Sequence, residues 1–260
     1  MTTHESAKLS SQWARPQKSR LKKLTLESSL KTKLKKTWLY PRHISQIYLR
    51  KAIQKASIYA QGILIDVGCG NRPYEPVLMK RVNRYIGVDW PVSPEKARQD
   101  ITGDASNLPF FNEVADTVLS TELMEHLKDP NHFLAEVARV LRTGGYLLLS
   151  VPFLEPLHEE PRDFYRFTEY GLKNILNNHG FEVKHIWERG HWWAVVFGSF
   201  IPQALFSYAS RPNKKARLLK ILLLLPVCAL SQLIGHFMDL LVKSGGKYTL
   251  GFFIVAVRHR

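Results

Sequence analysis

Cysteine is scarce in this chain, whose 260 residues contain only Cys69 and Cys228. Two isolated cysteines cannot build the disulfide framework of a small secreted domain. The first 20 residues also lack the apolar run of a secretory signal. The sequence therefore favours a protein that folds around its own core in a reducing compartment, and we expect the cytoplasm.

Acidic residues are scarce at both ends of the chain. Residues 1–60 hold 14 Lys and Arg against 2 Asp and Glu, and residues 191–260 hold 9 against 1. Residues 61–190 hold 14 against 19, so the middle is mildly acidic, as in an ordinary globular domain. The net charge of +15 belongs to the flanks, and such flanks indicate an anionic partner, either a membrane surface or a nucleic acid.

Several ligand motifs are missing as well. The chain has no Gly-Lys-Ser/Thr sequence to end a phosphate loop. Its glycine turn, "DVGCGNRP" at residues 66–73, carries Pro73 where a dinucleotide fingerprint needs a third glycine, and proline lacks an N–H and prevents close helix–strand packing. No spacing of cysteine or histidine is typical of a metal site, so the sequence predicts none.

What the chain does contain is an alternation of apolar strands with amphipathic helices. This pattern predicts a mainly parallel α/β sheet with helices on both faces, whose ligands bind at the carboxyl ends of the strands. Helices are expected over residues 43–60, from the N-cap Asp129 to Gly144, and over residues 168–178. The expected strands cover residues 63–67, 85–89, 101–103, 114–120, 146–151, 181–187 and 248–257.

Acidic side chains lie at or just after the carboxyl ends of three successive expected strands. Asp66 precedes the glycine turn, where a carboxylate would repel a diphosphate and attract a cation. Asp89 ends the next strand and can accept from two ribose hydroxyls, and Asp104 follows the third and can accept from an adenine amino group. S-adenosylmethionine (SAM) combines a cationic amino acid with a ribose and an adenine, so it fits this order of residues.

Class I SAM-dependent methyltransferases, and their type 11 group in particular (ubiquinone/menaquinone methyltransferase-like), resemble this chain in five ordered segments. The segments are "ILIDVGCG", "YIGVDW", "GDASNLPFFNEVADTVLSTELMEHLKDP", "VLRTGGYLLLSVP" and "GFEV". The resemblance covers about residues 60–190 and the last strand. It implies a Rossmann-like fold with a seven-stranded sheet, methyltransferase activity, and SAM as the cofactor.

The resemblance also implies roles for individual residues. Residues matching Asp66, Gly68 and Gly70 line the methionine part of SAM in the family, and those matching Asp89 and Asp104 hold its ribose and adenine. The chain departs from many relatives at Asn71-Arg72-Pro73, where a further glycine is common, and this departure affects the shape of the loop. Neighbouring residues expected to line the same cofactor site are Cys69, Trp90, Ala105 and Thr121.

Methyl transfer from a sulfonium mainly requires orientation and a site poor in water, with a general base where the acceptor must lose a proton. The candidate bases are His126 in "ELMEH" and His158 in "PLHEEPRDFYRFT", and the alternative for His126 is a structural bond to the backbone. The segment 156–168 is expected to overhang the pocket, either as an acceptor-binding lid or as a salt-bridged structural loop. Its candidate substrate-binding residues are Glu159, Arg162, Tyr165 and Arg166.

The chain begins with a basic extension over residues 1–42. The expected SAM-binding domain consists of residues 43–189 and 247–260, and a hydrophobic insertion over residues 190–246 separates these two parts. Written as a helix, residues 227–243 gather their polar side chains in a narrow arc and leave a broad apolar face. A transmembrane hairpin would place the basic residues of 211–220 outside, against the positive-inside tendency. The sequence therefore predicts a hairpin docked on the cytoplasmic membrane face, with a lid or a dimer interface as the alternative.

Three functions are consistent with these features. The first is a SAM-dependent methyltransferase acting at a membrane surface on a small apolar or lipid-linked acceptor, such as a polyprenyl-linked glycan or a quinone-type ring. The second is an RNA methyltransferase whose basic N-terminus binds phosphates, an account in which the insertion has no purpose. The third is a scaffold without catalysis, which would not need Asp66, Asp89 and Asp104 together. We expect the first, with nucleic acid disfavoured as a partner.

Overall fold

The structure is a computed structural model that describes residues 40, 42–90, 98–210, 214–242 and 247–259. The expected basic extension over residues 1–42 therefore lies almost wholly outside the described residues. The described strands are β1 (Ile63–Val67), β2 (Arg84–Asp89), β3 (Ile101–Thr102), β4 (Ala115–Thr121), β5 (Leu141–Pro152), β6 (Phe181–Glu188) and β7 (Gly251–Arg258).

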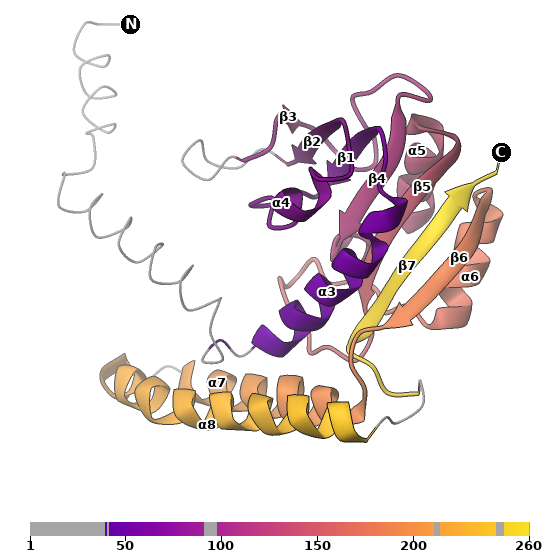
Figure 1. The fold of residues 1–260 in the computed structure, drawn as a ribbon. Coiled ribbons are helices and arrows are strands. Elements are labelled where there is room, and N and C mark those ends of the chain that lie inside the picture. Colours follow the sequence, from indigo (N-terminus) through magenta and orange to yellow (C-terminus); the bar gives the residue numbers. More distant parts are fainter. Residues whose placement is uncertain (1–39, 41, 91–97, 211–213, 243–246, 260) are drawn as a thin grey trace, which may run out of the picture.

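These strands form one sheet in the order β3-β2-β1-β4-β5-β7-β6 (Figure 1). The strands from β3 to β5 pair in parallel, whereas β7 runs antiparallel to both of its neighbours. This arrangement confirms the predicted Rossmann-like α/β fold with a mainly parallel sheet. The carboxyl ends of β1, β2 and β4 consequently meet at one edge, where the predicted site residues lie.

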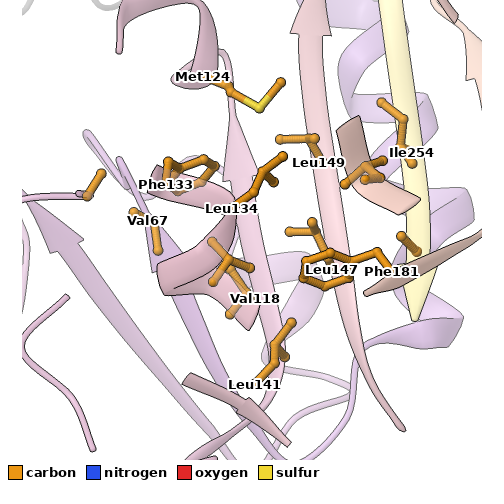
Figure 2. Packing of buried hydrophobic residues seen from close by; sticks show 14 of the residues in the cluster. Val67, Val118, Met124, Phe133, Leu134, Leu141, Leu147, Leu149, Phe181 and Ile254 are labelled. Atoms are coloured by element: carbon orange, nitrogen blue, oxygen red, sulfur yellow. The ribbon is translucent and has the colours of Figure 1, made fainter. Parts of the chain in front are cut away.

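Helices cover both faces of the sheet. Helix α3 (His43–Ala56), the 3₁₀ turn η1 (Ser57–Tyr59) and the short α4 (Glu75–Leu78) pack their apolar side chains on one face. On the other face lie the 3₁₀ turn η2 (Met124–His126), α5 (Pro130–Val140) and α6 (Glu169–Asn178). Figure 2 shows this second core, which includes Phe133 and Leu134 of α5 and the buried strand residues Leu147 and Leu149.

Several predicted boundaries are corrected by the structure, including the start of β5, which is Leu141 rather than residue 146. Helix α5 stops at Val140 rather than near Gly144, because Leu141 is extended and already pairs with Ala115 of β4. Strand β7 begins at Gly251 rather than at residue 248. Basic residues predicted to lie in a connecting loop belong in part to a helix that begins at Lys214, consistent with the high helix propensity of Lys, Arg and Leu.

The insertion folds into a helical hairpin. It consists of a π-helical segment, η3 (Ala194–Phe200), followed by α7 (Ile201–Ser210) and α8 (Lys214–Leu241). The hairpin lies across the lower end of the sheet in Figure 1. Gly251, the first residue of β7, pairs with Pro152, the last residue of β5, so the chain returns from the hairpin at the carboxyl edge of the parallel strands.

Candidate active site

The turn after β1 is held by hydrogen bonds within the protein. The amides of Gly68 and Cys69 both donate to the carbonyl of Val88, at 2.9 and 3.2 Å, and the amide of Gly70 donates to Oδ2 of Asp89 at 2.7 Å. Gly70 has a φ of 50°, and a Cβ atom added there would meet no described atom within 4 Å. The turn therefore leaves open space beside Gly70, as the close approach of a ligand to the backbone requires.

Asp66 is a buried carboxyl group at the base of this turn, with 1% of its surface exposed. Its Oδ2 accepts a hydrogen bond from the hydroxyl of Tyr85, and its Oδ1 has no hydrogen-bond partner among the described residues. Burial raises the pKa of Asp66 to about 7, against the opposing effects of Tyr85 and the guanidinium of Arg72. A buried carboxyl oxygen without a partner is suited to receive a cationic donor.

The two other acidic residues lie at the same edge. Asp89 Oδ1 accepts from the amide of Trp90 at 2.8 Å, and Asp104 Oδ1 accepts from the amide of Ser106 at 2.8 Å. They are neighbours because β3 pairs with β2, and the amide of Gly103 donates to the carbonyl of Asp89 at 3.0 Å. Trp90 is half-exposed beside them, whereas Ala105 is buried and Thr121 ends β4.

These residues fit SAM. The unpaired oxygen of Asp66 suits the cationic amino acid part, the open side of Gly70 leaves room for it, and Asp89 keeps acceptor capacity for ribose hydroxyls. The structure thus brings together the cofactor residues that the sequence predicts, although most of the amides of the turn are already engaged within the protein.

A pocket opens next to this turn, between the N-terminal half of α3 and the loops that follow β4 and β5. Of the predicted catalytic and acceptor residues, His126, His158 and Glu159 line it. Sequence reasoning missed the pocket residues from distant parts of the chain, which include Arg42, Ser45, Tyr74 and Arg189, whereas Glu122 belongs to the segment "ELMEH" that contains His126.

The other three predicted substrate-binding residues do not line this pocket, and two of them have structural partners elsewhere. Arg166 forms a two-pronged ion pair with Asp163, with N–O distances of 2.6 and 2.7 Å. The hydroxyl of Tyr165 donates to the carbonyl of Lys128 at 3.0 Å, and the side chain of Arg162 is exposed. The segment 156–168 is therefore a salt-bridged loop in this structure, and a direct role of these three side chains in acceptor binding stays a prediction.

The most deeply buried charge in the pocket is Arg189, which follows β6 and is 1% exposed. Its Nη2 lies 3.0 Å from Oε1 of Glu122, and that same carboxylate accepts from the hydroxyl of Ser150 at 2.8 Å. Glu122 has a φ of 51°, a backbone conformation that is strained for a residue with a side chain. No sequence signal connects these residues, because only the sheet order brings the ends of β4 and β6 into range.

Both candidate bases are oriented by backbone carbonyls. Nδ1 of His126 donates to the carbonyl of Arg162 at 2.7 Å, and Nδ1 of His158 donates to that of Pro156 at 3.1 Å. Since each ring uses its Nδ1–H in this way, its Nε2 is the nitrogen left to act as a base or a ligand. Beside them Glu125 is fully buried, and burial together with the charge of Glu122 raises the pKa of its carboxyl well above the usual range.

The helical hairpin adjoins the pocket through α3. Arg42, at the pocket, lies 3.8 Å from Glu155, which also accepts from Nε2 of Gln203 on α7 at 3.1 Å. The amide of Ile44 donates to Oε1 of Gln232 on α8 at 3.1 Å. The hairpin and the mouth of the pocket are thus parts of one hydrogen-bonded assembly.

Helix α8 turns its polar side toward the protein and its apolar side outward. The hydroxyl of Ser231 donates to the carbonyl of Phe197 at 2.6 Å, and Asp239 accepts from the hydroxyl of Tyr48 at 2.8 Å. Leu223–Leu241 is long and apolar enough to cross a membrane, with 28% of its most apolar window buried. Large apolar side chains that are 42–65% exposed on this helix are Leu223, Val227, Leu230, Leu233, Ile234, Phe237, Leu240 and Leu241.

Comparison with known families agrees with this site. Residues 65–149 match the family model described as "Methyltransferase domain". A "probable S-adenosylmethionine-dependent methyltransferase" of Mycolicibacterium smegmatis is 30% identical over 134 residues, which cover 46% of this chain and 52% of that protein. The domain match and this SAM-dependent relative indicate SAM as the cofactor.

Two further relatives have named acceptors. A phthiotriol/phenolphthiotriol dimycocerosates methyltransferase of Mycobacterium ulcerans is 54% identical over 98 residues, 34% of this chain and 36% of that protein. A tRNA (carboxymethyluridine(34)-5-O)-methyltransferase of Arabidopsis thaliana is 28% identical over 103 residues, 36% of this chain and 25% of that protein. The chain thus spans about half the length of these relatives or less.

Solved structures share the fold. The YcgJ protein of Bacillus subtilis is 15% identical, with a TM-score of 0.50 over 83% of this chain and 99% of its own. The [4+2]-cyclase SpnF is 17% identical, with a TM-score of 0.52 over 81% of this chain and 79% of its own. At this identity the likeness concerns the fold alone, and a cyclase among the neighbours illustrates that a fold does not determine a reaction.

Proposed function

Because residues 65–149 are a methyltransferase domain of the class I, SAM-dependent type, we propose that this protein transfers the methyl group of SAM to a lipid-linked or apolar acceptor at a membrane surface. The observation that carries the membrane part of the proposal is the orientation of α8. A surface helix of a soluble protein buries its apolar side and exposes its polar side. Here the buried positions include Ser231, Gln232 and Asp239, while the exposed side is formed largely by leucine, isoleucine, valine and phenylalanine.

Exposure of so much apolar surface to water is unfavourable, and a lipid surface is suited to cover it. Transfer of apolar side chains from water contributes about 0.8 kcal/mol per methylene. The flanking sequence is strongly basic, with five Lys and Arg in residues 211–220, and each such charge near an anionic leaflet contributes about 1 kcal/mol. Trp192 and Tyr248 lie edge to face at the base of the hairpin and are each more than 40% exposed, as expected of side chains at a membrane interface.

The contacts of α8 favour a helix that lies on the membrane over one that crosses it. Its inner side is hydrogen-bonded to α3 and η3 through Gln232, Ser231 and Asp239. A spanning helix would lose these hydrogen bonds inside the lipid, where an unsatisfied polar group has a high free-energy cost. The hairpin therefore docks at the cytoplasmic membrane face, with the pocket beside it.

In this position the pocket can receive an acceptor whose apolar part stays in the lipid. Bound SAM supplies an activated methyl group, so the protein has mainly to orient the two reactants and exclude water. Asp66, Asp89 and Asp104 hold the cofactor side. The ion pair of Arg189 and Glu122 supplies polar groups in fixed positions to the acceptor side. The relative from Mycobacterium ulcerans, whose name states a dimycocerosate acceptor, supports an apolar acceptor.

The proposal is tested by following the methyl group. Full-length protein is incubated with SAM labelled in its methyl group and with membranes from the cells that express it, and the label is then measured in the lipid extract and in purified RNA. We expect label in the lipid extract, and almost none with the Asp89→Ala variant. Label that enters neither fraction, or protein instead, would contradict the proposal.

An RNA acceptor is the second candidate. It is favoured by the tRNA-modifying relative and by the basic composition of residues 1–60. It is not favoured by the apolar outer side of α8, which would have no partner in an RNA complex. Label found in RNA, together with a gel shift of RNA and no sedimentation with liposomes, would establish this candidate over the first.

A further inference from the structure

Three potential metal ligands converge at the edge of the pocket. Nε2 of His126 lies 3.7 Å from Oε1 of Glu125, and Nε2 of His158 lies 4.0 Å from the same oxygen. One ligand atom from each of the three residues lies within 4.8 Å of the others. The two imidazole rings meet edge to face, with centroids 5.0 Å apart.

Two imidazole nitrogens and one buried carboxyl group converge at this point without forming a hydrogen bond to one another. Each Nδ1–H is used by a backbone carbonyl, so each Nε2 of the neutral rings presents a lone pair. Both carboxylate oxygens of Glu125 are buried and have no hydrogen-bond partner among the described residues. The distances of 3.7 and 4.0 Å exceed those of a hydrogen bond, so a shared proton does not join these atoms well.

A cation would satisfy all three groups at once. Metal–nitrogen and metal–oxygen bonds of about 2.0–2.2 Å place neighbouring ligand atoms about 3.0–3.4 Å apart, so the observed spacing needs to close by roughly 1 Å. The two Nδ1–carbonyl bonds are the outer hydrogen bonds that orient histidine ligands in metal sites. We propose that Glu125, His126 and His158 bind a divalent transition-metal ion of the zinc or cobalt type, since two imidazoles and one carboxylate suit such ions.

The site would remain open toward the pocket. His126 and His158 line the pocket, whereas Glu125 lies behind them. Glu159, whose Oε2 lies 4.0 Å from Nε2 of His126 and whose side chain is 70% exposed, could approach as a further ligand. Glu122 is excluded from this set because it is held by Arg189 and Ser150. An ion here would bind the hydroxyl of an acceptor in an open position and so select hydroxylated acceptors; that role rests on the proposed function, whereas binding of the ion does not.

Metal binding is measured without SAM or acceptor, so its failure is distinguishable from failure of methyl transfer. Full-length protein with a histidine-free tag is stripped with a chelator and titrated with Co²⁺, followed by its visible absorption. Wild type should bind one equivalent that Zn²⁺ displaces. Glu125→Gln and His158→Ala should each weaken Co²⁺ binding at least tenfold, while His132→Ala, which alters an exposed histidine on α5, should bind like wild type.

Glu125→Gln tests metal binding more specifically than His158→Ala does, because the Glu125 carboxylate has no hydrogen-bond partner among the described residues. It should unfold at the same temperature as wild type or higher in chelator, and it should lose the rise in Tm that Zn²⁺ causes in wild type. A wild type that binds no equivalent of Co²⁺, or a His132→Ala variant that loses binding as much as His158→Ala does, would overturn the proposal.

Discussion

At the scale of single residues, the raised pKa of Asp66 predicts that cofactor binding depends on pH. Its pKa is raised to about 7, first by burial, so in the folded protein it holds a proton that an unfolded aspartate with a pKa of 3.8 has already lost. Stability from this group is therefore fully present below pH 3.8 and falls as the pH rises toward and through 7. A cationic ligand favours the ionised form, so the affinity for SAM should rise between pH 6 and 8.

Calorimetry in buffers of different ionisation enthalpy checks this prediction. Near pH 6, binding of SAM to the wild type should release a proton, and Asp66→Asn should show weaker binding with little dependence on pH. Asp116→Asn serves as the control carboxylate, since Asp116 lies at the opposite end of β4 from the site. An affinity of the wild type that stays flat from pH 6 to 8 would show that Asp66 does not meet the cationic group.

Asp89 holds the turn, and we predict that it also binds the cofactor. Its carboxylate accepts from the amides of Gly70 and Trp90, and we expect it to accept from ribose hydroxyls as well. Asp89→Ala should therefore weaken SAM binding roughly tenfold or more, since hydrogen bonds to a charged group contribute about 1.5–3 kcal/mol. Calorimetry measures the affinity, thermal unfolding shows that the variant is folded, and an unchanged affinity would exclude the assignment.

At the scale of elements, we expect the outer side of α8 to bind the membrane. Leu233 and Phe237 are 45% and 62% exposed on its outer side, so charges there cost little in the free protein. Leu233→Glu with Phe237→Glu should leave the fold intact but keep the protein soluble when the wild type sediments with anionic liposomes. The reason is the loss of apolar burial together with repulsion from the anionic headgroups.

A matched control separates these causes from net charge alone. Phe111 and Tyr170 are 86% and 80% exposed and belong to the α/β domain rather than to the hairpin. Phe111→Glu with Tyr170→Glu changes the net charge by the same amount and should sediment like the wild type. If both double variants lose binding equally, the attraction is electrostatic and the outer side of α8 is not the docking surface.

At the scale of the whole molecule, the proposal places both ends of the hairpin and its connection on one side of the membrane. A cysteine at Asn213, in a variant without Cys69 and Cys228, should react with a membrane-impermeant thiol reagent only after the cells are opened. A cysteine at Tyr170, in α6, reports the side of the membrane on which the α/β domain lies, and it should behave in the same way. Labelling at position 213 alone in intact cells would mean that the hairpin crosses the bilayer.

Local interactions explain why much of the fold was predictable. Asp129 caps α5 by accepting from the amides of Asn131 and His132, and Thr168 caps α6 through the amide of Gly171. The apolar run before Asp66 became β1 with the predicted ends, and the order of strand, turn and acid placed the cofactor residues. The local pattern predicted a helix through Leu141, but this residue pairs with Ala115 in the sheet, so the predicted end of α5 was wrong.

The sequence by itself determined the α/β fold and the positions of Asp66, Asp89 and Asp104, because strand ends and turns are encoded within a few residues. Only the tertiary structure decided that Arg189 pairs with Glu122, that Glu125, His126 and His158 converge, and that α8 faces outward with its apolar side. Each of these depends on contacts between segments far apart in the chain. A hydrophobic pattern shows that a helix has two sides, but the hydrogen bonds of Gln232 and Asp239 to α3 and the segment before η3 decide which of them faces the protein.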